Sequence, residues 1–178
     1  MKKTMFLLIL GLAFLTKSHP QNMLMIGGDY NIMKPGFWGA GIGFNIRLFN
    51  NYLQNDALLM IGNVFLQDTD GKEEEKYLFY AKDNFYFSKE WKYIGLRAGA
   101  AVSLGIYENP DFPETIPLFL NAAVFAGLCF FPEALVSVTM DICPGHIFLF
   151  DILPSPSGND SAFSMPVSIS IRINLDRI

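Results

Sequence analysis

The chain has 178 residues, of which 51% are hydrophobic and 17% are charged, and its formal net charge is −4. This acidic balance argues against nucleic acid as a partner, because domains that bind nucleic acid present basic surfaces. No run of about 18 apolar residues follows residue 20, so the sequence predicts no transmembrane helix in that part. An apolar chain of this length without such helices is either a soluble β-protein or a β-barrel that spans a membrane.

The N-terminus has the pattern of a secretory signal peptide. Two lysines precede an apolar run at 5–15 that is too short to span a bilayer, and small side chains before position 19 favour cleavage after Ser18. We therefore expect a signal peptide at 1–18 and a single mature domain at 19–178, with a buried N-terminal helix as the alternative. Cleavage would leave 10 basic residues against 17 acidic ones, which makes the mature domain more acidic than the full chain.

Eight segments of the mature chain alternate between apolar and small or polar residues with a period of two, which is typical of β-strands. In the clearest segment, every even residue from Ile94 to Ile106 is apolar. A tilted strand that crosses a bilayer needs about 9–11 residues, with apolar side chains outside and polar side chains inside. Strands are predicted at 23–33, 37–49, 57–67, 76–87, 92–106, 117–130, 134–142 and 163–175. This pattern predicts an all-β fold, an eight-stranded antiparallel up-and-down transmembrane β-barrel.

The connections between these strands differ in length. With the N-terminus in the periplasm, the outer loops would lie at 34–36, 68–75, 108–116 and 143–162. The periplasmic turns would lie at 50–56, 88–91 and 131–133. Outer loops longer than periplasmic turns are typical of outer-membrane barrels. Aromatic residues gather at the periplasmic strand ends, which indicates an interfacial belt, with the aromatic core of a soluble sandwich as the alternative.

The interior of an eight-stranded barrel is just wide enough for side chains to fill it. Gly39, Gly41 and Gly43 alternate on the inward side of one strand and indicate a crowded interior. Charged side chains with inward parity should form a buried ion-pair network that fills the lumen, because buried charges need partners. The lumen candidates are Asp29, Arg47, Lys82, Arg97, Asp141 and Arg172. A narrow gated ion path is the alternative.

One further candidate depends on local strand geometry. Lys82 and Asp83 have opposite parity, and residues 82 and 97 would lie opposite each other across the turn at 88–91. Lys82 beside Arg97 would be repulsive. A bulge that turns Asp83 inward toward Arg97 would remove the repulsion, so Asp83 joins the lumen candidates.

The first and last strands must pair to close a barrel. Asp29 and Arg172 lie on these two strands, and both have inward parity. We therefore expect both residues in one ion-pair network, with Asp141 of the neighbouring strand as a further member.

Signals for catalysis and for metal binding are weak. His146 lies in the last predicted loop near Asp141 and Asp151 and near two serines, and a loop histidine near serines is common by chance. The segment 68–71, Asp-Thr-Asp-Gly, resembles the start of a calcium loop but lacks the remaining ligands. We therefore expect no catalytic residue, no metal and no cofactor.

The two cysteines could form a disulfide in an oxidising periplasm. If the sixth and seventh strands are joined by a short turn at Pro132, residue 129 lies opposite about residue 135. Cys143 would then be out of reach of Cys129, so we expect two free, buried thiols.

The signal peptide, the eight alternating strands and the terminal strand from Ser164 to Leu175 resemble small outer-membrane barrels of the OmpA transmembrane-domain, OmpX and OmpW type. The resemblance is architectural and covers most of the mature chain. It departs at the C-terminus, which ends in Asp176-Arg177-Ile178 where this type commonly ends in an aromatic residue. The resemblance implies export, assistance by periplasmic chaperones and the barrel-assembly machinery, and residence in the lipid of the bacterial outer membrane.

These expectations favour a non-enzymatic integral outer-membrane protein with a structural or surface-interaction, adhesin-like role, whose outer loops contact an extracellular ligand. The alternatives are a narrow gated pore, a soluble exported lipocalin-like carrier of an apolar ligand, and a lipid A-modifying barrel enzyme. A soluble carrier needs a polar outer face. Here the non-apolar faces carry glycine, serine and arginine, which are too sparse to coat a surface.

Overall fold

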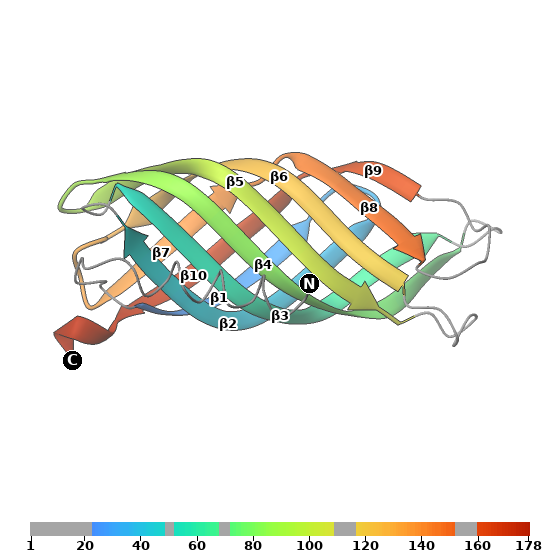
Figure 1. The fold of residues 1–178 in the computed structure, drawn as a ribbon, viewed down its shortest axis with the longest axis horizontal. Helices are drawn as coiled ribbons and strands as arrows, with labels where there is room; N and C mark the ends of the chain where they lie inside the picture. Colours follow the sequence, from blue (N-terminus) through green and yellow to red (C-terminus); the bar gives the residue numbers. More distant parts are fainter. Residues whose placement is uncertain (1–22, 49–51, 68–71, 109–116, 152–159) are drawn as a thin grey trace, which may run out of the picture.

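A computed structural model describes residues 23–48, 52–67, 72–108, 117–151 and 160–178, and within these ranges the chain forms one closed antiparallel sheet (Figure 1). The strands are β1 Met23–Asn31, β2 Gly36–Leu48, β3 Leu53–Gln67, β4 Glu73–Glu90, β5 Ile94–Tyr107, β6 Pro117–Phe130, β7 Val136–Ile142, β8 Gly145–Asp151, β9 Asp160–Ser164 and β10 Pro166–Asn174. A 3₁₀ turn at Leu175–Arg177 ends the chain. No helix in the described ranges is long and apolar enough to cross a membrane.

The ten segments form eight continuous barrel strands. β7 and β8 pair with β6 in one register, from Phe130↔Val138 to Pro117↔Asp151, and are separated only at Cys143 and Pro144. Proline cannot donate a hydrogen bond to the ladder, which interrupts the strand there. β10 and β9 likewise continue one register along β7 and β8 and are separated only at Met165.

The barrel closes because the first and last strands pair. β1 pairs with β10 over its whole length, from Met23↔Asn174 to Asn31↔Pro166. The remaining neighbours are consecutive in sequence, including β5 with β6. The predicted eight-stranded antiparallel up-and-down barrel is therefore confirmed.

The two ends of the barrel differ (Figure 1). The loop end carries the connections β1–β2, β3–β4, β5–β6 and β8–β9, and the turn end carries the connections β2–β3, β4–β5 and β6–β7 together with the C-terminus. The signal peptide expected at 1–18 and most of the loops expected at 68–75 and 108–116 lie outside the described residues.

Four predicted connections were partly wrong. The loop expected at 143–162 contains β8 and the start of β9, because Pro144 and the apolar run Phe148-Leu149-Phe150 hide the alternation there. The turns expected at 50–56 and 88–91 are shorter, since β3 begins at Leu53 and β4 continues to Glu90. β4 also begins at Glu73, inside the expected acidic loop. The start of this strand was missed because its first residues are all charged and show no alternation of apolar and polar side chains.

Each strand has an apolar outward face, and nearly all buried polar side chains point inward. On the outside, Ile42 and Val124 are 62% and 63% exposed, whereas Asn45 and Arg172 on the inside are 0% and 1% exposed. This distribution is the reverse of that in a water-soluble barrel and is the distribution required by a barrel in lipid. It opposes the alternative of a soluble lipocalin-like carrier.

Candidate functional site

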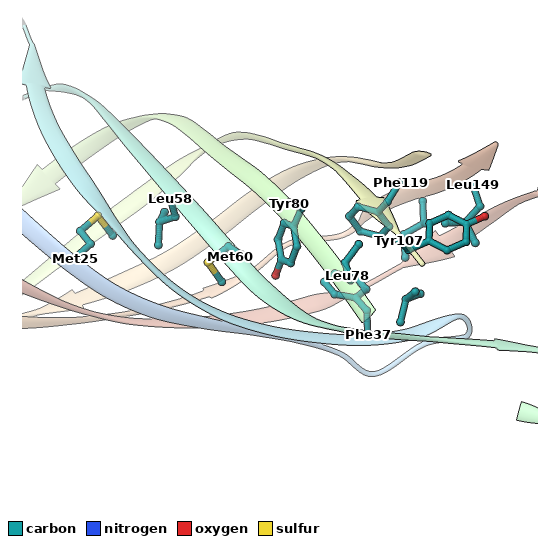
Figure 2. Close-up of a cluster of buried hydrophobic side chains, with 11 residues drawn as sticks. Met25, Phe37, Leu58, Met60, Leu78, Tyr80, Tyr107, Phe119 and Leu149 are labelled. Carbon is teal, nitrogen blue, oxygen red and sulfur yellow. The ribbon is translucent and has the colours of Figure 1, made fainter. Parts of the chain in front are cut away.

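The loop half of the lumen is filled by a cluster of apolar side chains, called here the apolar plug (Figure 2). Its aromatic centre joins three strands: the ring centroids of Phe37 and Phe119 are 5.3 Å apart, and those of Tyr80 and Phe119 are 5.7 Å apart. The apolar plug consists of Met25, Phe37, Leu58, Met60, Val64, Leu78, Tyr80, Tyr107, Phe119, Ile147 and Leu149. Figure 2 shows these side chains spread along the barrel axis, with Met25 reaching back toward the turn half.

Gly39 makes room for the ring of Tyr80 in the apolar plug. A Cβ atom added at Gly39 would overlap the phenol oxygen and two ring carbons of Tyr80. Tyr80 is fully buried and fits only because β2 lacks a side chain at that point. The sequence prediction that the alternating glycines reflect a crowded interior therefore agrees with the packing at this position.

Below the apolar plug, a buried cluster links β1, β4 and β10. The Lys82 Nζ atom lies 2.6 Å from Asp29 Oδ1 and donates a hydrogen bond of 2.6 Å to the Ser168 hydroxyl. The Ser168 hydroxyl donates to the same carboxylate at 2.6 Å, and the Tyr80 hydroxyl donates to Asp29 Oδ2 at 3.1 Å. Asp29 and Lys82 are 7% and 5% exposed, so this ion pair is shielded from water.

The turn half is organised around the Asp56 carboxylate. Arg97 and Arg172 both reach Asp56 Oδ2 through their Nη2 atoms, at 2.6 Å and 2.9 Å. Asn45 and Tyr86 donate to Asp56 Oδ1 at 2.7 Å and 3.1 Å. Asp56 is 0% exposed, so one buried carboxylate binds two guanidinium groups and two neutral donors.

Two further contacts surround the Arg97 guanidinium. Its central carbon lies 4.1 Å from the centroid of the Tyr86 ring, a cation–π distance. Asp141 Oδ1 lies 3.0 Å from Arg97 Nε, so β7 contributes a second carboxylate to the group. The Arg172 Nη2 atom also donates to the Tyr86 hydroxyl at 2.6 Å.

A third pair closes the turn end of the lumen. Arg47 Nη2 lies 3.3 Å from Glu90 Oε2, and Gln54 donates to Glu90 Oε1 at 3.0 Å. Arg47 is buried, and the Glu90 side chain is only 13% exposed. We call the groups around Asp56 and Glu90 the charged half; its charged members are Arg47, Asp56, Glu90, Arg97, Asp141 and Arg172.

Six of the seven lumen candidates point inward, and Asp83 does not. β4 runs through Asp83 without a bulge, in one register with both β3 and β5, so Asp83 stays on the outward face. There the Asn55 amide donates a hydrogen bond to its carboxylate. Lys82 lies opposite Ser103 and not Arg97, because β4 is three residues longer than predicted at the turn end and this shifts the register. The repulsion that the bulge was meant to relieve is therefore absent.

Asp29 and Arg172 fall into different clusters. Asp29 contacts Lys82, Ser168 and Tyr80, whereas Arg172 contacts Asp56. The ion pairs of the structure therefore do not join Asp29 and Arg172 in the single network that was expected. Asp141 joins the cluster of Arg172 and not that of Asp29.

Sequence reasoning missed Asp56 and Glu90, the two carboxylates that organise the charged half. Both residues lay in segments predicted as turns, so the sequence analysis did not ask whether their side chains point into the lumen. Charge balance could have found them: with Asp83 outside, the candidates hold four basic groups and only Asp29 and Asp141 as acids. Buried charges need partners, and Asp56 and Glu90 bring this set of candidates to four acids and four bases.

The arrangement is suited to filling space and pairing charge. His146 lies on the outward face beside Phe148 and Phe163, with ring centroids 6.3 Å and 5.8 Å away, whereas Asp141 points into the lumen. The histidine and this carboxylate are therefore on opposite sides of the wall, and 152–159 with the two serines lies outside the described residues. Among the described residues, no group of three His, Cys, Asp or Glu side chains could hold a metal ion. The calcium-like segment 68–71 also lies outside them.

The two cysteines are free and buried. Cys129 pairs with Thr139 and not with residue 135, because the β6–β7 turn is wider than expected and includes Phe131 with a φ of 56°. Cys143 still lies four residues beyond the position opposite Cys129, so the expectation of free thiols is confirmed.

No family model matches this sequence, and no curated protein matches it. Among solved structures, the crystal structure of Neisserial surface protein A (NspA) is similar to 87% of this chain over 97% of its own length, with a TM-score of 0.56 and 10% sequence identity. The outer membrane protein Ail of Yersinia pestis, solved in a phospholipid bilayer nanodisc, covers 87% of this chain and 100% of its own, with a TM-score of 0.44 and 13% identity. The closed barrel and the likeness to NspA show that this chain has the fold of a small eight-stranded outer-membrane β-barrel.

Proposed function

We propose that the protein is an integral bacterial outer-membrane barrel that does not conduct solutes and acts through its loop end as a surface-interaction, adhesin-like protein. The observation that carries this proposal is the filled lumen. The apolar plug occupies the loop half, and paired charges with a smaller apolar cluster around Tyr86 and Phe125 occupy the turn half, which supports a lumen closed to solutes. Activity must then lie on the outside of the barrel or at its ends.

The outward face supports a membrane location. Large apolar side chains cover every barrel strand, and burying them in lipid avoids the free-energy cost of their exposure to water. In this proposal the segment 1–18 is removed on export, and periplasmic chaperones and the barrel-assembly machinery deliver the domain 19–178 to the outer membrane.

The loop end supports an interaction role. β4 begins with three consecutive glutamates, Glu73 to Glu75, of which the first two extend the β3–β4 hairpin beyond the end of β2 at Gly36. Such an arm presents charge outside the apolar band, where an extracellular ligand can reach it. Neutralising the three glutamates with glutamine should reduce adhesion of bacteria that display the protein, if the arm contributes to binding.

Fractionation and conductance test the proposal. The protein should sediment with outer membranes, resist extraction by carbonate and migrate faster in detergent gels before heating than after. Purified protein should give no steady conductance in planar bilayers. Recovery from the soluble periplasm would overturn the membrane location, and a steady conductance would overturn the closed lumen.

A narrow gated pore is the second candidate, and the buried charged groups of the charged half favour it. The apolar plug and the Arg47–Glu90 pair would then both have to move for ions to pass. A Phe37→Ala, Phe119→Ala double variant should open a steady conductance if the plug is a gate. A variant that folds and stays silent would favour the structural barrel.

A further inference from the structure

The outer wall of the barrel carries an apolar groove near the loop end, away from the lumen. The hollow has a volume of about 540 Å³ and crosses β2, β3, β4 and β5. Two outward rows of side chains border it: Trp38, Asn63 and Tyr77 on the loop-end side, and Ala40, Ile61 and Phe79 on the other. The small outward side chain of Ala40 leaves space between these rows, and the backbone of Gly62 lines its floor.

The groove is continuous with the surface that faces lipid. Its large bordering residues are exposed, with Tyr77 at 73%, Ile61 at 65% and Phe79 at 50%. Trp38 and Tyr77 are the residue types that sit at the boundary between hydrocarbon and headgroups. An occupant that enters from the bilayer therefore places an apolar chain in the groove and a polar group beyond Tyr77.

The polar edge of the groove is acidic. The backbone N–H of Glu108 donates to the Tyr77 carbonyl at 2.9 Å, which fixes Glu108 at this edge, and the Asn63 amide donates to the Glu75 carboxylate. Nearby Glu73 and Glu74 are neutralised by lysines, at 2.8 Å and 2.6 Å. Glu75 and Glu108 form no ion pair with any described residue, so two uncompensated carboxylates lie beside the end of an apolar groove.

We propose that this groove binds a phospholipid with an ammonium headgroup, of the phosphatidylethanolamine class, with one acyl chain between the two rows and the ammonium group near Glu75 and Glu108. The proposal rests on the proposed membrane location. It adds a specific lipid site to a wall that would otherwise contact bulk lipid without selection.

Quenching of Trp38 fluorescence tests the site directly. The chain has two tryptophans, and Trp91 lies at the opposite end of the barrel, so a Trp91→Phe background leaves Trp38 as the only reporter. This protein is placed in nanodiscs of phosphatidylethanolamine and phosphatidylglycerol, with dibrominated acyl chains on one lipid at a time. Brominated phosphatidylethanolamine should quench Trp38 with an apparent preference of about two- to fivefold over brominated phosphatidylglycerol, the range that an exposed ion pair supports.

Two matched pairs of variants separate the acyl and headgroup contacts. Ala40→Phe should fill the groove and abolish the excess quenching, whereas Ala57→Phe, the same change on the outward face beyond the groove, should leave it intact. Glu108→Gln should reduce the headgroup preference while both lipids still quench, and Glu133→Gln at the turn end should change nothing.

The outcomes distinguish the site from the membrane location. Equal quenching by the two lipids, or equal effects of Ala40→Phe and Ala57→Phe, would overturn the lipid site while leaving the barrel in the membrane. A folded protein whose Trp38 is quenched by neither lipid would overturn the membrane location itself, and the lipid site with it.

Discussion

The two halves of the lumen are stabilised by different kinds of interaction. The apolar plug is held by close packing of aromatic and aliphatic side chains, so its stability follows the volume that these side chains occupy. The charged half is held by complementary charges that are buried, so that each group depends on its partners. A truncation in the plug should therefore have a graded cost, whereas loss of one charge should leave others unpaired.

The charged half should be the more sensitive to a single substitution. Asp56→Ala leaves Arg97 and Arg172 without their shared carboxylate, so we expect a loss of about 3–5 kcal/mol in the free energy of unfolding, measured by urea titration in detergent micelles. A second substitution, Arg97→Met, should recover part of this loss. If Asp56→Ala costs no more than Asp83→Ala on the outer face, the comparison between the halves fails.

The apolar plug should respond to the size of the deletion. Phe119→Ala removes a fully buried ring and should cost about 3 kcal/mol, while Phe119→Leu should cost clearly less, because the cost follows the cavity that remains. The same urea titration compares the two variants. Equal losses for Leu and Ala at this position would show that packing volume does not control the plug.

Coupling between charges should follow the clusters seen in the structure. A double-mutant cycle of Asp29→Ala with Lys82→Met should show an interaction energy of about 1–3 kcal/mol, because the two groups are direct partners. A cycle of Asp29→Ala with Arg172→Ala should be additive within about 0.5 kcal/mol, because they share no partner. Strong coupling in the second cycle would mean that the two clusters act as one network.

The outward carboxylate should give the smallest effect and the opposite sign. Asp83 is an exposed acid on an apolar face, bonded to Asn55. Replacing it with leucine should stabilise the barrel by about 1 kcal/mol, since an acidic group facing lipid costs less than the 2–4 kcal/mol of a basic one at the midplane. The neutral control is Ala57→Leu. A loss of stability in Asp83→Leu would show that the carboxylate has a partner in the membrane.

The amino-acid sequence by itself determined which side chains face the lumen. Val102 and Ser103, for example, are adjacent in sequence, and the structure leaves Val102 46% exposed and Ser103 2% exposed, as the alternation predicts. Facing is a local property, because successive side chains of a strand point to opposite sides. The number of strands and the closure of the barrel follow from counting the alternating segments. Pro144 obscures the alternation only in its own part of the seventh strand, so the count is unaffected.

Only the tertiary structure decided which inward residues meet. Asp56 became the centre of the charged half, and Lys82 met Asp29 and not Arg97, because β3 and β4 extend further toward the turn end than their alternation shows. Register depends on where each turn lies in the chain, and moving a turn by a few residues moves each partner by twice that number. Such a shift leaves the alternation within each strand unchanged. The sequence pattern therefore predicts which side chains point into the lumen, but not which of them contact each other there.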